Sequence, residues 1–252
     1  MKHFVKPKNL PVLALGLGAA ALVLQKAAYI LAVDEKGLLI LSHPLCIALW
    51  LVSLLALGLI GVSVWKLDGS QCYEDNFAAD SSAFAGHAAA AIGIGYTVLR
   101  YLPAGPGYLG QAWIYLGYLS PVCLLLAGYA RMRGKKPFFL LHMIPTLFYV
   151  LHLINHYQSW CANPQLPDYI FTLLGTMTLA LFGLHQTCFD VDLGNRRILL
   201  ASGLCAVFFC MAELAVSSYP ILYLGSILWA VTGLCAPEPK PNAEPEPEEK
   251  EE

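Results

Sequence analysis

The sequence predicts an all-α integral membrane protein, a polytopic bundle of about eight transmembrane helices. Apolar residues make up 58% of the 252-residue chain and charged residues only 13%, whereas charged residues approach roughly a quarter in soluble proteins. The apolar residues also gather in stretches close to the roughly 20 residues that a helix needs to cross a hydrocarbon core. A water-soluble fold is therefore excluded, and residues 1–236 are expected to form one transmembrane domain.

Eight such stretches follow one another along the chain. They are Leu10–Val33, His43–Trp65, Ser81–Leu102, Tyr108–Met132, Pro137–Gln158, Tyr169–Phe189, Ile198–Ser217 and Pro220–Ala236. The first follows Lys2, Lys6 and Lys8, a pattern also found in signal peptides. We expect it to be an uncleaved span, because the apolar run continues past Lys26 through Ala27–Val33 and lacks a clean small-x-small cleavage site.

Proline and glycine mark several of the breaks between spans. Pro103–Gly107 cannot continue a helix, and Asn163–Pro164 and Tyr219–Pro220 separate the later spans in the same way. Such short connections predict antiparallel neighbours. Pro121 and Pro145 lie inside predicted spans, where each removes a backbone hydrogen bond and is expected to kink the helix.

The third span carries a stripe of small residues. Ala85, Ala89 and Gly93 recur every fourth residue, with Gly86 and Ala90 beside them. Small side chains let another helix approach closely, and in lipid such packing is a main source of helix association. The stripe predicts a central span that packs against another helix of the same chain.

Basic residues set the predicted orientation, because cytoplasmic loops of membrane proteins are enriched in lysine and arginine. They gather in two even-numbered connections and are sparse in the connections on the opposite side. The residues concerned are Arg131, Arg133, Lys135, Lys136, Arg196 and Arg197. Both termini are therefore predicted to be cytoplasmic.

The C-terminal segment 237–252 is a distinct region of low complexity. It holds seven Glu, two Lys and five Pro, which gives it a charge of -5 and leaves +3 on the rest of the chain. Such a composition cannot bury enough apolar surface to fold, so we expect a disordered acidic tail. The basic residues of the membrane domain form no stripe, which excludes a nucleic-acid partner.

Sequence motifs give no catalytic assignment. The chain has no HExxH, GxSxG or GxxxxGK[ST] motif, and its eight cysteines form no CxxC pair and suit apolar packing. No catalytic residue is predicted, and enzyme activity is left open. The bilayer is the one partner that the composition requires.

Ionisable groups inside the spans are the strongest functional signal, because they are costly in lipid and face the bundle interior or a cavity. One layer, about five residues from the predicted cytoplasmic helix ends, contains His87, His142 and His185. A second layer lies toward the other side. It contains Lys26, His43, His152, Asn155, His156 and Glu213, with Arg100 near the same surface.

Three interpretations of these layers are open. His152, Asn155 and His156 share a helix face, and with Glu213 they could bind a small solute or a divalent ion. Alternatively, His142 and His185 sit at matching depth and could ligate haem iron from two sides. In the third interpretation the histidines only bond to carbonyl groups or water near helix ends. Neither a cofactor nor a metal can be named from the sequence.

The leading functional hypothesis is a membrane protein that binds or transports a small solute or ion through an intramembrane His/Glu site. The alternative is a non-catalytic scaffold or accessory subunit. The segments His156–Trp160, Asn163–Pro164 and Asp168–Tyr169, followed by a leucine-rich span, resemble part of uncharacterised bacterial multi-pass membrane proteins. That resemblance implies a bacterial cytoplasmic membrane location and no known activity.

Overall fold

The computed structural model describes residues 9–34, 39–65, 67, 71–77, 79–100, 108–160 and 169–234. These residues contain nine α-helices and no strand, apart from one isolated β-bridge between Val33 and Leu39. The helices are α1 (Leu10–Leu31), α2 (Pro44–Trp65), α3 (Tyr73–Asn76), α4 (Ser81–Arg100), α5 (Tyr108–Met132), α6 (Leu140–Trp160), α7 (Ile170–Asp190), α8 (Arg196–Glu213) and α9 (Pro220–Leu234). The all-α prediction is confirmed. The acidic tail and the breaks 103–107 and 163–164 lie outside the described residues.

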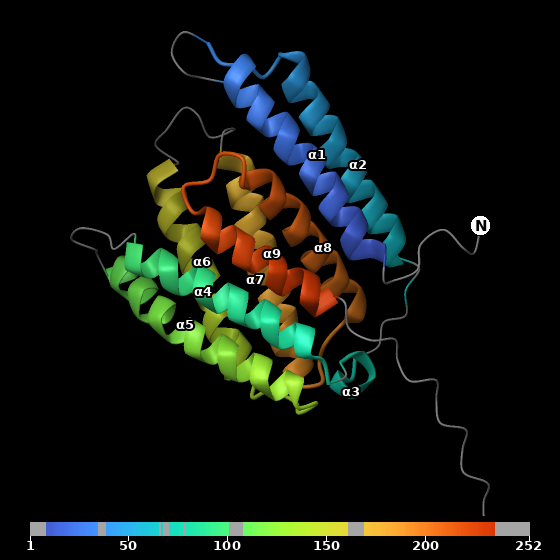
Figure 1. Cartoon of the computed structure of the whole chain (residues 1–252), viewed down its shortest axis with the longest axis vertical. Helices are drawn as coiled ribbons and strands as arrows, with labels where there is room; N and C mark the ends of the chain where they lie inside the picture. Colours follow the sequence, from blue (N-terminus) through green and yellow to red (C-terminus); the bar gives the residue numbers. More distant parts are fainter. Residues whose placement is uncertain are drawn as a thin grey trace, which may run out of the picture.

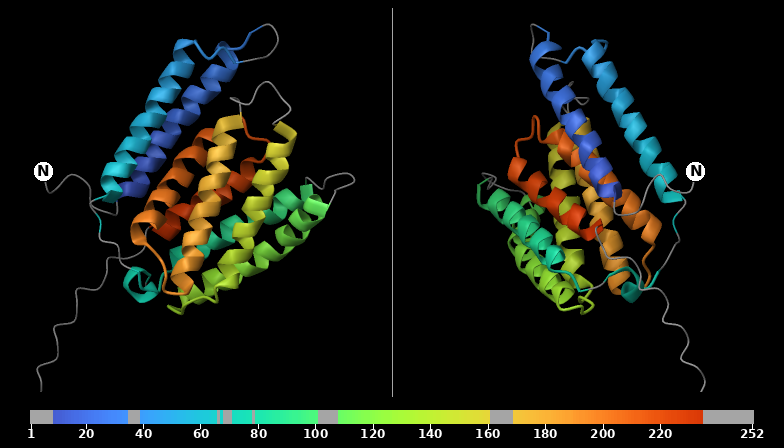
Figure 2. Two further views of the ribbon diagram at one scale, coloured as in Figure 1. Left: turned by 180° about the vertical axis from the view of Figure 1, so that it is seen from behind. Right: turned by 45° about the vertical axis from the view of Figure 1, so that its right-hand side comes forward.

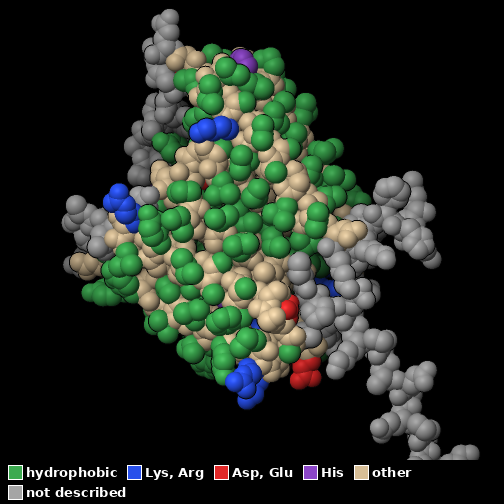
Figure 3. Space-filling model, viewed as in Figure 1, with side chains coloured by type: hydrophobic (Ala, Val, Ile, Leu, Met, Phe, Trp, Pro, Cys, Tyr) green, Lys and Arg blue, Asp and Glu red, His purple; other side chains and the backbone are tan. Residues whose placement is uncertain are grey.

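Five of the described helices are long and apolar enough to cross a membrane by length and composition, namely α1, α2, α4, α5 and α7. Large apolar side chains are exposed along them, most of all on α2, where Leu51, Leu54 and Val62 are each 60% or more exposed. Hydrophobic side chains cover most of the face seen in Figure 3. An apolar surface of this extent is unusual for a soluble protein and suits contact with lipid.

Six of the described helices form a closed ring. Each packs against the next in the order α4, α5, α6, α7, α8 and α9, and α9 packs back against α4. The hairpin of α1 and α2 lies outside this ring and packs on α8, as Figures 1 and 2 show. The interior of the ring is therefore the place where buried polar residues from distant parts of the sequence meet.

Local sequence explains where several helices begin. The Asn195 side chain accepts hydrogen bonds from the backbone N–H groups of Arg197 and Ile198, which caps α8. Pro44 and Pro220 are the first residues of α2 and α9, positions where a missing N–H has no cost within the helix. Pro121 and Pro145 lie inside α5 and α6, as predicted.

The small-residue stripe of α4 packs against α9. A Cβ atom added to Gly86 would lie 2.9 Å from the Leu228 carbonyl oxygen, and one added to Gly225 would lie 2.4 Å from the Ala89 carbonyl oxygen. The two backbones therefore approach each other too closely for a larger side chain. The predicted intramolecular packing is confirmed, although α4 is one member of the ring and does not occupy its centre.

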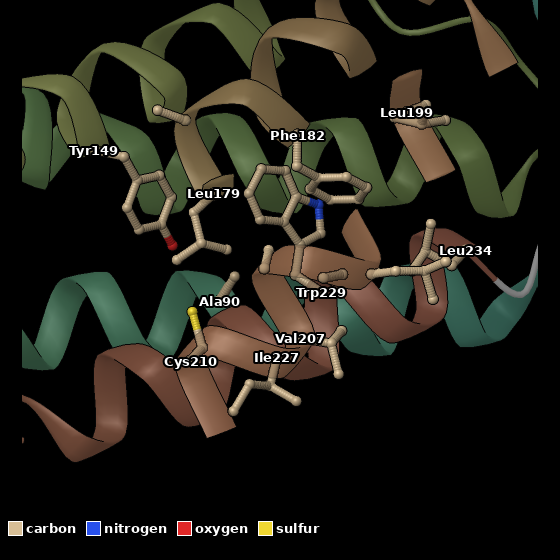
Figure 4. Close-up of a cluster of buried hydrophobic side chains, with 14 of the residues drawn as sticks. Ala90, Tyr149, Leu179, Phe182, Leu199, Val207, Cys210, Ile227, Trp229 and Leu234 are labelled. Atoms are coloured by element: carbon tan, nitrogen blue, oxygen red, sulfur yellow. The ribbon is translucent and has the colours of Figure 1, made fainter. Parts of the chain in front are cut away.

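Large aromatic side chains fill the middle of the ring. Figure 4 shows Trp229 of α9 beside Phe182 of α7, with Leu179 and Tyr149 next to them. The ring centroids of Trp229 and Phe182 are 5.1 Å apart, and Trp229 stacks on Tyr149 at 6.3 Å. All four side chains are fully buried.

Three connections meet at one end of the bundle, which we call the polar end. Arg197 donates a hydrogen bond from Nε to the Leu67 carbonyl, and the Tyr73 backbone N–H donates to Asp192. Lys136 forms an ion pair with Asp192. The segments after α2, α5 and α7 therefore lie on the same side, as expected from the antiparallel order of the spans.

Candidate functional site

Three buried ionisable side chains form a hydrogen-bonded chain at the polar end. His87 of α4 lies 3.1 Å from His142 of α6, measured between their Nε2 atoms. Nδ1 of His142 lies 2.6 Å from Oδ2 of Asp190, near the end of α7. Nδ1 of His87 lies 2.6 Å from the Ala83 carbonyl oxygen. The two histidines are 0% exposed and Asp190 is 6% exposed, so this chain of side chains lies buried inside the ring.

Arg131 supplies a buried positive charge next to this chain. Its Nη1 donates a hydrogen bond of 2.9 Å to Oε1 of Gln186, and the guanidinium also bonds to the Tyr73 hydroxyl. The charge of Arg131 interacts with both His87 and Asp190. Arg131 is only 3% exposed, although in the sequence it opens a basic segment at the end of a predicted span.

The short helix α3 covers the polar end. The Arg131 guanidinium carbon lies 4.0 Å from the centre of the Phe77 ring, a cation–π contact. Phe77 in turn packs edge-on against Phe189 of α7, with 5.3 Å between ring centroids. Residues 71–77 therefore lie over the polar end and shield the buried charges from solvent.

Two ionisable groups of this cover have shifted pKa values. Burial raises the pKa of Tyr73 to about 12. The hydrogen bonds from Lys136 and from the Tyr73 backbone N–H lower the pKa of Asp192. Asp192 has a positive φ of 56°, in the left-handed region that aspartate tolerates. The turn after α7 thus carries an ionised carboxylate against α3.

Several polar atoms around the chain have no hydrogen-bond partner. They are Oδ1 of Asp190, Nε2 of Gln186 and Nε1 of Trp229, all buried. Trp229 lies 6.0 Å from His87 between ring centroids. A buried polar group without a partner is costly, so these atoms mark a place where a small polar species would be stabilised.

The structure brings together two of the three histidines predicted for this layer. His87 joins His142, whereas His185 is only partly buried on α7 and is not among the partners of His142. Both ring nitrogens of His142 already contact protein groups. This arrangement does not support the hypothesis that His142 and His185 ligate haem.

The second predicted layer forms an aromatic cluster at the opposite end of the ring. His152 is 1% exposed, and its ring stacks against Trp113 and Phe148 at 6.0 Å and 5.9 Å. His156 lies 4.2 Å from His152 between ring centroids, and Tyr219 contacts both histidines. Both ring nitrogens of His152 and Nε1 of Trp113 have no partner.

Glu213 and Asn155 complete the residues predicted for this layer. Glu213 is 4% exposed, bonds to Thr172 and interacts electrostatically with Cys210 and Tyr223. Asn155 is partly buried beside the histidines on α6. No group of three or more His, Cys, Asp or Glu side chains that could hold a metal ion is found among the described residues.

Hydroxyl groups lie between the two layers. The Tyr149 hydroxyl is 2.7 Å from the Ser226 hydroxyl, and the Tyr223 hydroxyl is 3.1 Å from that of Thr176. All four residues are buried. The ring interior therefore carries polar groups at several depths, interrupted by the aromatic core.

Sequence reasoning misses Asp190 and Arg131. Asp190 follows the predicted span that ends at Phe189, and Arg131 is grouped with loop residues because it opens a basic segment. One signal is present in the sequence, since both residues fall within one turn of a predicted span boundary. Their burial depends on α3, which covers the helix ends at this side. The sequence does not predict that cover.

Comparisons with known proteins give no relative: no protein-family model, no curated protein and no solved structure matches the chain. The structure alone thus defines the class, an all-α protein with several helices able to cross a membrane.

Proposed function

We propose that this chain is an eight-span protein of the bacterial cytoplasmic membrane with both termini in the cytoplasm. The packing of the ring supports eight spans. The helices α6, α8 and α9 each pack against helices that are long and apolar enough to cross a membrane. At about 1.5 Å per residue, the 15 residues of α9 extend about 22 Å. This is short of a hydrocarbon core of roughly 30 Å, so the connection before α9 must enter the core for this span to be complete.

Within this bundle, the function that the site favours is binding and transport of a small solute or ion, coupled to proton exchange. The observation that carries the proposal is the buried chain of His87, His142 and Asp190. Histidine and carboxylate chains inside membrane bundles are characteristic of proton relays, since imidazole can accept a proton at one nitrogen while the other donates.

The second layer extends this function to the opposite side of the ring. His152 and Glu213 are buried away from lipid, and the unpartnered nitrogens of His152 could accept or donate a hydrogen bond to a solute. We propose that His152, Asn155, His156 and Glu213 form the solute side of the path. The aromatic core between the layers would separate the two sides.

The runner-up function is a scaffold or accessory subunit, which the large buried aromatic residues of the ring would suit. A scaffold, however, does not require a buried histidine–aspartate chain, whereas a proton relay through a membrane bundle does.

The test is electrical recording of reconstituted vesicles on a solid-supported membrane after a sudden pH change. The wild-type protein is expected to give a transient current as protons enter the buried chain. His142→Gln removes the central proton carrier, so its current is expected to be lost. His185→Gln is the matched control, because His185 lies at similar depth on α7 but outside the chain, and it is expected to keep the current.

The proposal would be contradicted if the wild-type protein gave no pH-dependent current. The protein density in the vesicles must be one at which known proton-translocating membrane proteins give a current. Equal currents in wild type and His142→Gln would also contradict the proposal.

A further inference from the structure

An oxygen atom stands at each end of the His87–His142–Asp190 chain. At one end is the Ala83 carbonyl oxygen, 2.6 Å from Nδ1 of His87, and at the other is the Asp190 carboxyl, 2.6 Å from Nδ1 of His142. Between them the two Nε2 atoms lie 3.1 Å apart. The chain therefore contains three short polar contacts in series.

Each of these contacts needs one proton between its two heavy atoms. A carbonyl oxygen can only accept, so Nδ1 of His87 must carry a proton. A neutral imidazole carries one ring proton, and two neutral imidazoles therefore supply two. An ionised Asp190 supplies none. Three contacts and two protons leave one contact without a hydrogen bond.

We propose that the structure represents a proton-loaded state, in which the chain holds one proton beyond those of two neutral histidines and an aspartate ion. That proton sits on Asp190, on His142 or on His87. Proton shifts along two of the hydrogen bonds, Asp190–His142 and His142–His87, interconvert these forms while the heavy atoms stay in place. If the proposed transport function holds, H⁺ is the ion that it moves. The proton site itself does not depend on that function.

Release of the extra proton to water has a defined structural consequence. Nδ1 of His87 keeps its proton for the Ala83 carbonyl, and Nδ1 of His142 keeps its proton for the ionised Asp190. Both Nε2 atoms then carry a lone pair and face each other at 3.1 Å. Two acceptors at that distance repel, so α4 and α6 lose their polar contact across the ring.

The surrounding charges act unequally on the two states, because the positive charge of Arg131 opposes a proton on His87 and favours an ionised Asp190. Arg131 of α5 interacts with His87 and with Asp190, and Asp80, before α4, interacts with Arg131. Tyr73 of α3 and Cys188 of α7 interact with Asp190.

The remaining neighbours either form an ion pair with each other or carry no charge. Lys136 and Asp192 pair with each other near α3, and α9 contributes the uncharged Trp229. When the proton leaves, Asp190 carries a negative charge that Arg131 balances. When the proton is bound, all three hydrogen bonds are complete. The proton-bound state has no missing hydrogen bond, and the proton-released state has no unbalanced carboxylate. The His87–His142–Asp190 chain is therefore suited to exchange the proton.

The unpartnered oxygen of Asp190 agrees with the loaded state. Oδ1 is buried and has no hydrogen-bond partner. An unpartnered oxygen is less costly on a protonated carboxyl group than on a carboxylate, because burying a charge costs more than burying a neutral polar group.

The experiment is nuclear magnetic resonance of the full chain in lipid nanodiscs with ¹⁵N-labelled histidine. A scalar coupling through the hydrogen bond between two ring nitrogens identifies the His87–His142 pair. Infrared difference spectra monitor a protonated carboxyl group at Asp190. At low pH we expect the nitrogen–nitrogen coupling, together with an imidazolium signal in this pair or a protonated Asp190. As the pH is raised, one proton should leave and the coupling should vanish with it.

Asp190→Asn provides the decisive variant. The amide that this substitution introduces can donate to Nδ1 of His142, which completes three hydrogen bonds with two neutral histidines, so the coupling should persist at all pH values. Asp192→Asn, an exposed carboxylate two residues away, is the control and should keep the wild-type pH dependence. Wild-type spectra with two neutral rings, an ionised Asp190 and no change with pH would overturn the inference. If the spectra show the proton step while vesicles give no current, the proton site stands and the transport function fails.

Discussion

At the residue scale, the polar end is a balance between buried charges and the groups that satisfy them. Arg131 is surrounded by the Phe77 ring, Gln186 and the Tyr73 hydroxyl. A buried guanidinium without such partners would be strongly destabilising. The cover formed by α3 is therefore as much a part of the site as the histidines are.

Tyr73 gives the first prediction at this scale. Its pKa is raised to about 12 by burial, against an ordinary value of 10. The folded state therefore binds a proton that the unfolded state has lost between these pH values, and the stability that Tyr73 provides falls as the pH rises from about 10 to about 12, by about 1.4 kcal/mol per pH unit. The measurement is chemical unfolding in detergent at several pH values.

Tyr73→Phe is the matched variant for this prediction. It retains the ring that packs 5.0 Å from Phe77 and removes only the hydroxyl. The variant should be less stable than wild type at neutral pH, and its stability should fall less steeply above pH ~10. If the free energy of unfolding fell equally steeply with pH in both proteins, Tyr73 would not be the source of the pH dependence.

Glu213 gives a second prediction at the residue scale. Glu213→Gln keeps an oxygen that can accept the Thr172 hydrogen bond but removes an ionisable carboxyl group from a residue that is 4% exposed. Asp80→Asn removes a charge near the polar end, where Asn can still cap α4 through Ser82. The pH-jump current should fall more in Glu213→Gln than in Asp80→Asn.

Stability has to be measured alongside, because removing one member of a buried polar group can unfold a protein by itself. Equal currents in the two variants, at equal stability, would count against a functional acid in α8.

At the element scale, close contact between α4 and α9 holds one side of the ring. Gly225→Ala should destabilise the protein by about 1–3 kcal/mol, as expected for overpacking, since its Cβ would lie 2.4 Å from the Ala89 carbonyl oxygen. Gly61→Ala is the matched control, because Gly61 on α2 has no atom within 4 Å of an added Cβ. That change should be neutral or stabilising by up to about 1 kcal/mol through helix propensity. Thermal unfolding of the two variants in detergent measures the difference, and similar losses in both would contradict the close packing of α4 and α9.

Helix positions could be predicted from sequence because apolar runs and proline both act locally. The predicted span Tyr108–Met132 coincides with α5, and Ser81–Leu102 ends two residues beyond α4. The partners of the histidines could not be predicted, because depth along a helix says nothing about its rotation or its neighbours. Depth alone pairs His142 with His185 on the adjacent helix, whereas the structure places it against His87 across the ring.

At the scale of the whole molecule, the ring separates two sites of different chemistry. The polar end holds the histidine–aspartate chain under α3, and the opposite end holds the aromatic cluster around His152. The hairpin of α1 and α2 covers α8 from outside (Figure 2). Lys26 of this hairpin donates a hydrogen bond to the Ala215 carbonyl oxygen, just past the end of α8, where a cation is favoured by the helix dipole.

The last prediction concerns how this molecule lies in the membrane. The polar end joins the connections after α2, α5 and α7 through Leu67, Lys136, Asp192 and Arg197, so reporter fusions in these connections must agree with one another. The basic residues of two of them predict that all three face the cytoplasm. Reporters fused after Arg133 and after Arg197 should therefore report the cytoplasm, and reporters fused after Gly105 and Pro164 should report the outside. If the pair after Arg133 and Arg197 disagreed, the shared polar end would be wrong. If all four were inverted, the bundle would stand and only its orientation, with the proton site then on the outer side, would have to be reversed.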